Sequence, residues 1–221
     1  MAAAEVVAAV AGRPAAARVS EANPLPEPAR TWVYDFVAAP HRQLLRPGAL
    51  CPALPLVLEL RQLYWGPIDY AGMESSARVP VHGLASLLRE ALGGAVRILT
   101  ASGDEYRTAV LWLIESVPRY AYRAVIEPAF LAIRAESVEA GIMVGCFHPY
   151  RQRRSRVQPD LMTMRSPVPM IAMRRLMRSD LHSIKDEPRS LEAFHRYFAA
   201  HDRDRRTGRN SLERCAADLS P

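Results

Sequence analysis

Residues 141–149 read Gly-Ile-Met-Val-Gly-Cys-Phe-His-Pro and give the clearest structural signal in this chain of 221 residues. A short apolar run that follows a glycine and ends before a proline is typical of a buried strand. We therefore predict a central strand at 142–147. A similar run predicts a second strand at 170–173, and two further strands are expected at 57–64 and 96–100.

Helices are expected between these strands. Apolar residues recur there at helical spacing, and Pro or Gly residues mark the ends. The predicted helices begin near Thr31, Leu84, Asp104, Pro128 and Pro188. The second is expected to stop at Gly93–Gly94, and the third, which contains Val110 and Leu113, at Pro118.

The order of these elements favours the α+β class, because strands and helices are mixed without a regular strand–helix–strand rhythm. We expect a single domain over residues 30–201, with a small mixed or antiparallel sheet packed with helices. Residues 1–29 are rich in Ala and Pro, and we expect a disordered tail there. The highly charged residues 202–221 are expected to form a C-terminal tail.

The net charge of +6 is concentrated in one part of the chain. Residues 151–180 contain eight arginines and two aspartates, and the remainder is close to neutral. Arginine recognises carboxylates and phosphates in a bidentate manner. No segment approaches the ~20 consecutive apolar residues of a membrane helix. Because no signal peptide is evident either, we expect a cytoplasmic protein with no membrane partner.

The first candidate site lies in the loop from Pro40 to Pro52. This loop is rich in Pro and Gly and contains His41 and Cys51, which could supply a ligand or a nucleophile. The alternative is that Cys51 is a small buried side chain and that His41 only caps the loop. Cys146 is a second candidate nucleophile. The three cysteines include no C-x-x-C pair, which argues against a disulfide framework and a structural zinc site.

The second candidate follows the predicted central strand. His148 ends that strand, where side chains often line clefts, and a neutral imidazole there could ligate a metal or haem iron. Equally, it could be a core-edge histidine bonded to a carbonyl. Gly141 and Gly145 allow close approach to the backbone, which suits either a flat cofactor or tight packing of side chains.

The third candidate is the arginine-rich segment after His148. Arg154 and Arg156, with Arg165 further on, are suited to binding carboxylates, phosphates or haem propionates. The alternative is a solvated, charged loop. Nucleic acid is a disfavoured partner, because aromatic residues are scarce here and no helix-turn-helix, zinc-finger or ribonucleoprotein motif is present. Rossmann, P-loop, zinc-protease and serine-hydrolase motifs are also missing from the sequence.

Three stretches resemble motifs of an uncharacterised bacterial family of domains of unknown function. A stretch P-H…R-x-G-x-V-C-P-F corresponds to residues 40–52 here. The motif G-L-M-x-G-x-F-H-P corresponds to 141–149, and R-S-P-x-P-x-x-A-I-R-H-M corresponds to 165–176, with Asp180 following. The resemblance covers about residues 31–200.

This chain departs from the family pattern at two positions. Ala53 stands where an aromatic residue is expected, and Arg175 stands where a histidine is expected. If that histidine is a ligand in the family, this chain has lost it.

A looser similarity is to YqcI/YcgG-type proteins, and it is carried by Cys51-Pro52 and by the arginines of 153–156 after Tyr150. Some members of that group are haem-dependent enzymes that hydroxylate arginine in natural-product pathways. The resemblance implies a b-type haem with one protein ligand and with basic residues on its propionates.

Our first hypothesis is therefore a haem-dependent oxygenase, or a related tailoring enzyme, acting on a small amino-acid-like substrate in bacterial secondary metabolism. His148 would be the axial ligand, with His41 and Cys51 as catalytic residues or reserve ligands. The cofactor or a substrate carboxylate would be held by Arg154, Arg156 and Arg165, and Phe147 and Trp65 would pack on the ring. The alternatives are a cofactor-free small-molecule-binding or accessory protein, and a cysteine-dependent enzyme. A homodimer is left open.

Overall fold

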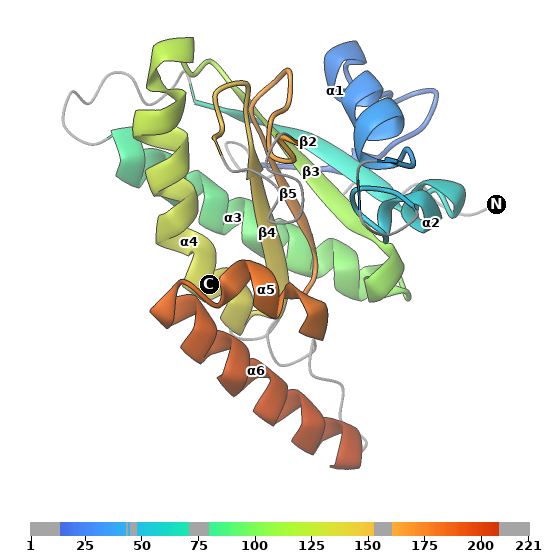
Figure 1. Ribbon diagram of the computed structural model, residues 1–221, viewed down its shortest axis with the longest axis vertical. Helices are drawn as coiled ribbons and strands as arrows, with labels where there is room; N and C mark the ends of the chain where they lie inside the picture. The colour runs from blue at the N-terminus through green and yellow to red at the C-terminus, as the bar shows by residue number, and fades with distance from the viewer. Residues whose placement is uncertain (1–13, 43, 45–47, 71–79, 153–160, 208–221) are drawn as a thin grey trace.

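The computed structural model describes residues 14–42, 44, 48–70, 80–152 and 161–207 (Figure 1). Within these residues the centre is a five-stranded sheet in the order β1-β2-β3-β5-β4. The strands are β1 (Ala17–Arg18), β2 (Leu63–Asp69), β3 (Ala109–Glu115), β4 (Ile142–Phe147) and β5 (Met170–Arg175). β2 and β3 are parallel, and the other neighbouring pairs are antiparallel. The predicted α+β class with a mixed sheet is confirmed.

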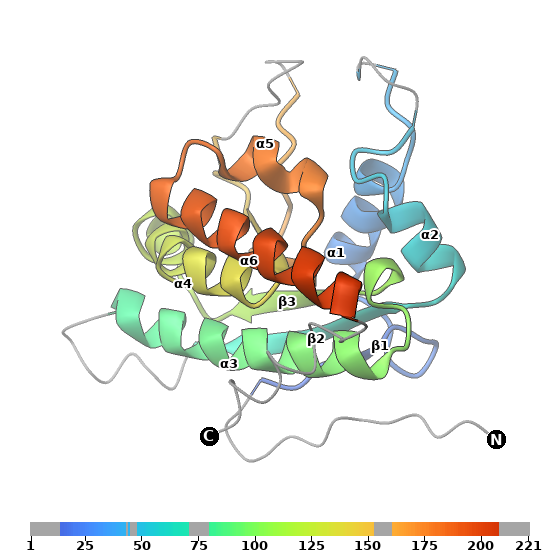
Figure 2. The ribbon, with the colours of Figure 1, turned by 90° about the horizontal axis from the view of Figure 1, so that it is seen from below.

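Helices cover both faces of the sheet (Figures 1 and 2). One face packs against α3 (Pro80–Ala101) and α4 (Glu127–Glu139). The other face packs against three elements. These are α1 (Glu27–Thr31), the π-helical segment Trp32–Val37 that follows α1 directly, and α2 (Leu54–Glu59). A third apolar cluster joins the end of α4 to α5 (Leu181–Ile184) and α6 (Pro188–Thr207). Short helical turns lie at Glu105–Arg107, Arg119–Ala121, Tyr122–Ile126 and Arg178–Asp180.

β3 shows why the sheet has a core on each face. Val110, Trp112 and Ile114 belong to the core under α3 and α4, whereas Leu111 and Leu113 belong to the core under α1 and α2. This division follows from the two-residue period of a strand. The helix predicted for this segment is wrong, because a strand buried on both faces lacks the alternation of polar and apolar residues that identifies strands.

The strand predicted at 96–100 is also wrong, because this segment is the last part of α3. The helix continues through Gly93 and Gly94 without a break. A Cβ atom at Gly94 would lie 3.4 Å from Cζ2 of Trp112. That is an ordinary van der Waals distance, so the packing of α3 on β3 leaves room for a Cβ atom here, and the glycine does not end the helix.

The strand predicted at 57–64 is replaced by two elements. α2 ends at Glu59, and its Pro55 lies in the first turn. A proline is tolerated there because the backbone N–H groups of the first turn have no hydrogen-bond partner within the helix. β2 begins at Leu63 and continues through Gly66 and Pro67, beyond the end of the predicted strand.

The strands predicted at 142–147 and 170–173 are confirmed as β4 and β5, but β4 lies at an edge of the sheet and not at its centre. Ordered structure begins earlier than Thr31, because β1 pairs with β2 and Leu25 is buried. At the other end α6 continues beyond residue 202 to Thr207. Of the tails predicted at 1–29 and 202–221, residues 1–13 and 208–221 lie outside the described residues. No described helix is long and apolar enough to cross a membrane.

Candidate functional site

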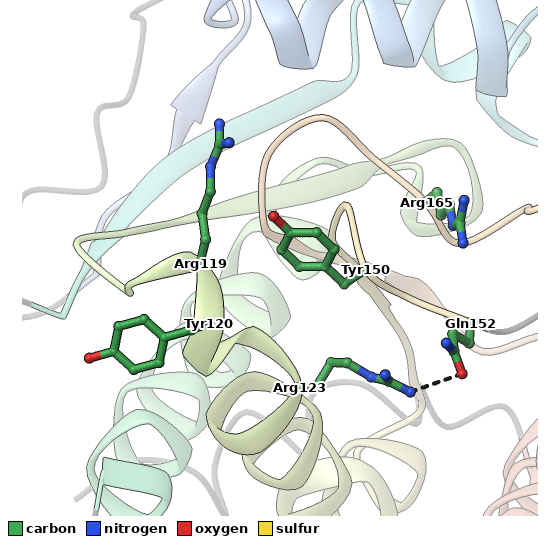
Figure 3. Close-up of a pocket in the computed structure, with 6 residues that line it drawn as sticks. All are labelled: Arg119, Tyr120, Arg123, Tyr150, Gln152 and Arg165. Carbon is green, nitrogen blue, oxygen red and sulfur yellow. Dashed lines mark hydrogen bonds between the residues drawn. The ribbon is translucent and has the colours of Figure 1, made fainter.

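A pocket of about 600 Å³ lies beside the loop that follows β4 (Figure 3). Three parts of the chain contribute to it: the helical turns that precede α4, the loop after β4 and the segment before β5. The lining residues are Arg119, Tyr120, Arg123, Tyr150, Gln152 and Arg165. In Figure 3 the ring of Tyr150 occupies the middle of this group, with Arg119 and Tyr120 on one side and Arg165 on the other.

The lining is strongly basic. Its described residues include three arginines and no carboxylate. Nη2 of Arg123 donates a hydrogen bond of 2.9 Å to Oε1 of Gln152. Arg119, Arg123 and Arg165 form no ion pair with any residue in the part of the chain that the structure describes. Their charges therefore add at the pocket, which makes it attractive to anions.

His148 fixes the start of the loop that carries Tyr150. Its Nδ1 accepts a hydrogen bond of 3.3 Å from the backbone N–H of Tyr150. The proton of the neutral ring is therefore on Nε2, which donates to Oε1 of Glu127 at 3.0 Å. Burial lowers the pKa of His148 below its ordinary value, and the hydrogen bond with Glu127 offsets this only in part. His148 is thus a neutral imidazole with both nitrogens engaged.

Glu127 connects His148 to the same loop at a second point. Its other carboxylate oxygen pairs with Arg151, whose side chain is only 11% exposed. The guanidinium of Arg151 also lies 5.7 Å from the centre of the Phe130 ring on α4. Because Glu127 begins α4, this buried network holds the loop after β4 against the helix whose preceding turns form the opposite wall of the pocket.

Arg165 is anchored from another direction. Its carbonyl oxygen accepts a hydrogen bond of 2.7 Å from Nε1 of Trp32, and its Nε donates to the carbonyl of Arg151 at 3.3 Å. Trp32 in turn contacts the ring of Phe147 edge-on, with 5.0 Å between the ring centres. The backbone of Arg165 is therefore fixed while its side chain lines the pocket.

The family model of a domain of unknown function, DUF6875, matches residues 27–209. The chain belongs to the DUF6875 family. This confirms the resemblance to an uncharacterised domain family. No curated protein and no solved structure matches the chain. In this DUF6875 domain the stretch 141–149 ends at the pocket and the stretch 165–176 begins there.

Two residues predicted from the arginine-rich segment, Arg154 and Arg156, lie outside the described residues. Of the remaining predicted site residues, Arg165 lines the pocket and His148 supports it from within the protein. Phe147 lies in the apolar cluster with Trp32 and is not part of the lining.

Sequence reasoning missed the part of the pocket contributed by the turns before α4. Arg119 and Arg123 come from two consecutive short turns, a 3-10 turn at Arg119–Ala121 and a π-helical turn at Tyr122–Ile126. Nothing in the sequence indicates that these turns meet the loop after β4.

His41 and Cys51 are directed to different partners. Nε2 of His41 donates to the carbonyl oxygen of Phe36 at 2.5 Å, in the helical segment that precedes the loop. Cys51 lies beside the guanidinium of Arg174, which also forms two hydrogen bonds of 2.9 and 2.6 Å with Asp180. Burial alone would lower the pKa of Arg174, but its hydrogen bonds with Asp180 and Cys51 raise it above the ordinary value.

The predicted thiol and base are therefore not brought together: in the described part of the chain no hydrogen bond joins His41 to Cys51. Cys146 does not fit a nucleophile either. Burial raises the pKa of its thiol to about 12, so that the thiolate is scarce near neutral pH. A Cβ atom at Gly145 would lie 2.7 Å from Cε2 of Phe147, so this glycine makes room for an internal side chain.

The residues around His148 do not fit an axial haem ligand in this conformation. Ligation would have to displace either the hydrogen bond from Tyr150 or the one to Glu127, and the side chain is completely buried. Among the described residues, no group of three or more His, Cys, Asp and Glu side chains could hold a metal ion. The haem-dependent oxygenase stays a prediction, which titration of the protein with hemin and a visible spectrum would test.

Proposed function

We propose that this domain binds a small anionic molecule, with a phosphate or carboxylate group, in the pocket between Tyr150 and the turns that precede α4. The observation that carries the proposal is the meeting of three arginines in one pocket without a carboxylate among its described lining residues. Arginine on a carboxylate or phosphate forms charge-assisted hydrogen bonds, which are about twice as strong as neutral ones.

The size and support of the pocket agree with this function. Its volume of about 600 Å³ falls within the range of small-molecule sites. The loop after β4 is held by Glu127 and His148, and Arg165 is held by Trp32. A lining that is fixed before the ligand arrives loses little conformational entropy on binding.

The described lining favours binding over a reaction within the pocket. It offers guanidinium, phenol and amide groups, and it includes no carboxylate, imidazole or thiol that could serve as a base or nucleophile. The function is therefore closest to the cofactor-free small-molecule binder that the sequence left open as an alternative.

The test is isothermal titration calorimetry of the full chain with inorganic phosphate at low ionic strength. Arg123→Gln and Arg165→Gln each remove one guanidinium and keep a polar side chain. Because a hydrogen bond to a charged group contributes about 1.5–3 kcal/mol, each variant should bind phosphate at least about tenfold more weakly. Raising the salt concentration should weaken binding by the wild type as well.

Arg89→Gln is the matched control. It changes the net charge by the same amount, but Arg89 pairs with Glu136 on the surface and does not line the pocket. Its phosphate affinity should equal that of the wild type within about twofold, since an exposed ion pair contributes little. An equal loss in Arg89→Gln and Arg123→Gln would show that only the overall charge attracts phosphate, and the proposed site would be wrong.

A further inference from the structure

Tyr150 presents an aromatic ring to the pocket in a way that the binding of an anion does not require. Its side chain is 44% exposed, although it is one of the lining residues. On one side it is backed by the ring of Tyr122, with 6.0 Å between the ring centres and an angle of 43° between the planes. Tyr122 is itself buried, and its ring lies edge-on to the ring of His148, with 5.9 Å between the ring centres. The ring of Tyr150 therefore packs on one side against buried aromatic side chains, and Figure 3 shows it among the residues that line the pocket.

The backbone that carries this ring is fixed at two adjacent positions. The N–H of Tyr150 donates to His148, and the next residue, Arg151, is paired with Glu127. The carbonyl of Arg151 also accepts the hydrogen bond from Arg165. These bonds make His148 a positioning residue for Tyr150. A rigid, partly exposed aromatic side chain gives a large contact area at a low cost in conformational entropy.

The charges of the pocket stand on both sides of the same ring. In Figure 3 Arg119 lies to the left of Tyr150, Arg165 lies to its right and Arg123 lies below it. A flat group stacked on Tyr150 would therefore have guanidinium groups within the same pocket for an attached anion. A ligand that consists of an anion alone would leave the exposed ring without a partner.

We infer that the ligand joins a flat aromatic ring to a phosphate or carboxylate, and that the ring stacks on Tyr150 while the arginines hold the anion. This inference rests on the proposed function and names the class of ligand for the same site. A stacking contact between a base and an aromatic side chain strengthens binding by roughly fivefold to a hundredfold.

The test compares AMP with ribose 5-phosphate by calorimetry, because the two share the sugar and the phosphate and differ in the ring. The wild type should bind AMP about tenfold more tightly. Tyr150→Phe should keep this preference, whereas Tyr150→Leu and Tyr150→Ala should lose it and keep their affinity for ribose 5-phosphate. Tyr34→Ala is the control, because Tyr34 is similarly exposed, at 42%, and does not line the pocket.

Equal affinities for AMP and ribose 5-phosphate in the wild type, together with binding of inorganic phosphate, would overturn the inference and leave the proposed function standing. Failure of all three to bind would overturn the proposed function itself. A preference for AMP that survives in Tyr150→Leu would show that the ring binds elsewhere, against the inference. A single-stranded oligonucleotide that binds far more tightly than AMP would replace the small-molecule ligand by nucleic acid.

Discussion

Replacing Gly141 by alanine tests the packing at the start of β4. Gly141 has a φ of +71°, a conformation that disfavours residues with a side chain. A Cβ atom there would lie 2.5 Å from Cε2 of Tyr197 and 2.9 Å from Nη1 of Arg175. The strained φ costs about 1 kcal/mol, and the forced shift of packed side chains costs about 1–3 kcal/mol more. We expect Gly141→Ala to lower the free energy of unfolding by about 3 kcal/mol.

Gly103 supplies the control for the backbone contribution. Its φ is +72°, nearly the same, but a Cβ atom there would meet nothing within 4 Å. Gly103→Ala should therefore lose only about 1 kcal/mol, from the strained φ alone. Urea denaturation followed by circular dichroism would measure both losses, and the melting temperature should fall about 2–4 °C for each kcal/mol. Equal losses in the two variants would refute the proposed clash with Tyr197 and Arg175.

Three further predictions concern titratable and charged groups. Cys146, whose thiol is buried with a pKa of about 12, should resist iodoacetamide at pH 8 in the folded protein and react once urea unfolds it. Peptide mapping would locate the label, and rapid labelling of Cys146 itself in the folded protein would contradict the burial. Burial lowers the pKa of His148 below 6.5, so the folded state binds a proton on this side chain less readily than the unfolded state. The free energy of unfolding should therefore fall as the pH drops below about 6.5. His148→Asn should make this fall with pH less steep. Asp180→Asn removes the charged partner of Arg174 and should destabilise the fold by about 2–3 kcal/mol, measured by urea denaturation. Asp202→Asn, which breaks the exposed ion pair with Arg178, should change the stability by less than about 1 kcal/mol, and equal effects of the two substitutions would contradict this prediction.

Arg175 occupies a buried position at the end of β5. It stands where the resemblance expects a histidine, and its side chain is 1% exposed. It pairs with Glu105 at 3.3 Å and lies 5.4 Å from the centre of the Tyr197 ring. Burial raises the pKa of Glu105, while the charge of Arg175 acts in the opposite direction. In this chain the position therefore serves packing and charge pairing within the core.

The sequence predicted the candidate site in part. The residues of 141–149 and Arg165 indicated where a site would form, because side chains at a strand end often line clefts and arginine is suited to binding anions. It did not predict that His148 would be closed off by Glu127 and by the backbone of Tyr150. Glu127 lies 21 residues from His148 along the chain, and a hydrogen bond over that separation cannot be derived from local spacing. A candidate ligand could therefore not be distinguished from a positioning residue.

The sequence by itself determined the α+β class, the strands β4 and β5 and the concentration of arginine after β4, because each depends on composition or on a local pattern of apolar residues. Only the tertiary structure decided that β3 is a strand, because burial of both faces of β3 removes the alternation of polar and apolar residues that marks a strand. The position of β4 at an edge of the sheet was also decided only by the tertiary structure, because it depends on the order of the strands. The pocket was also decided at that level. Arg119, Tyr150 and Arg165 meet only because the sheet order places the loop after β4 between α4 and the segment before β5, and that order follows from contacts distant along the chain.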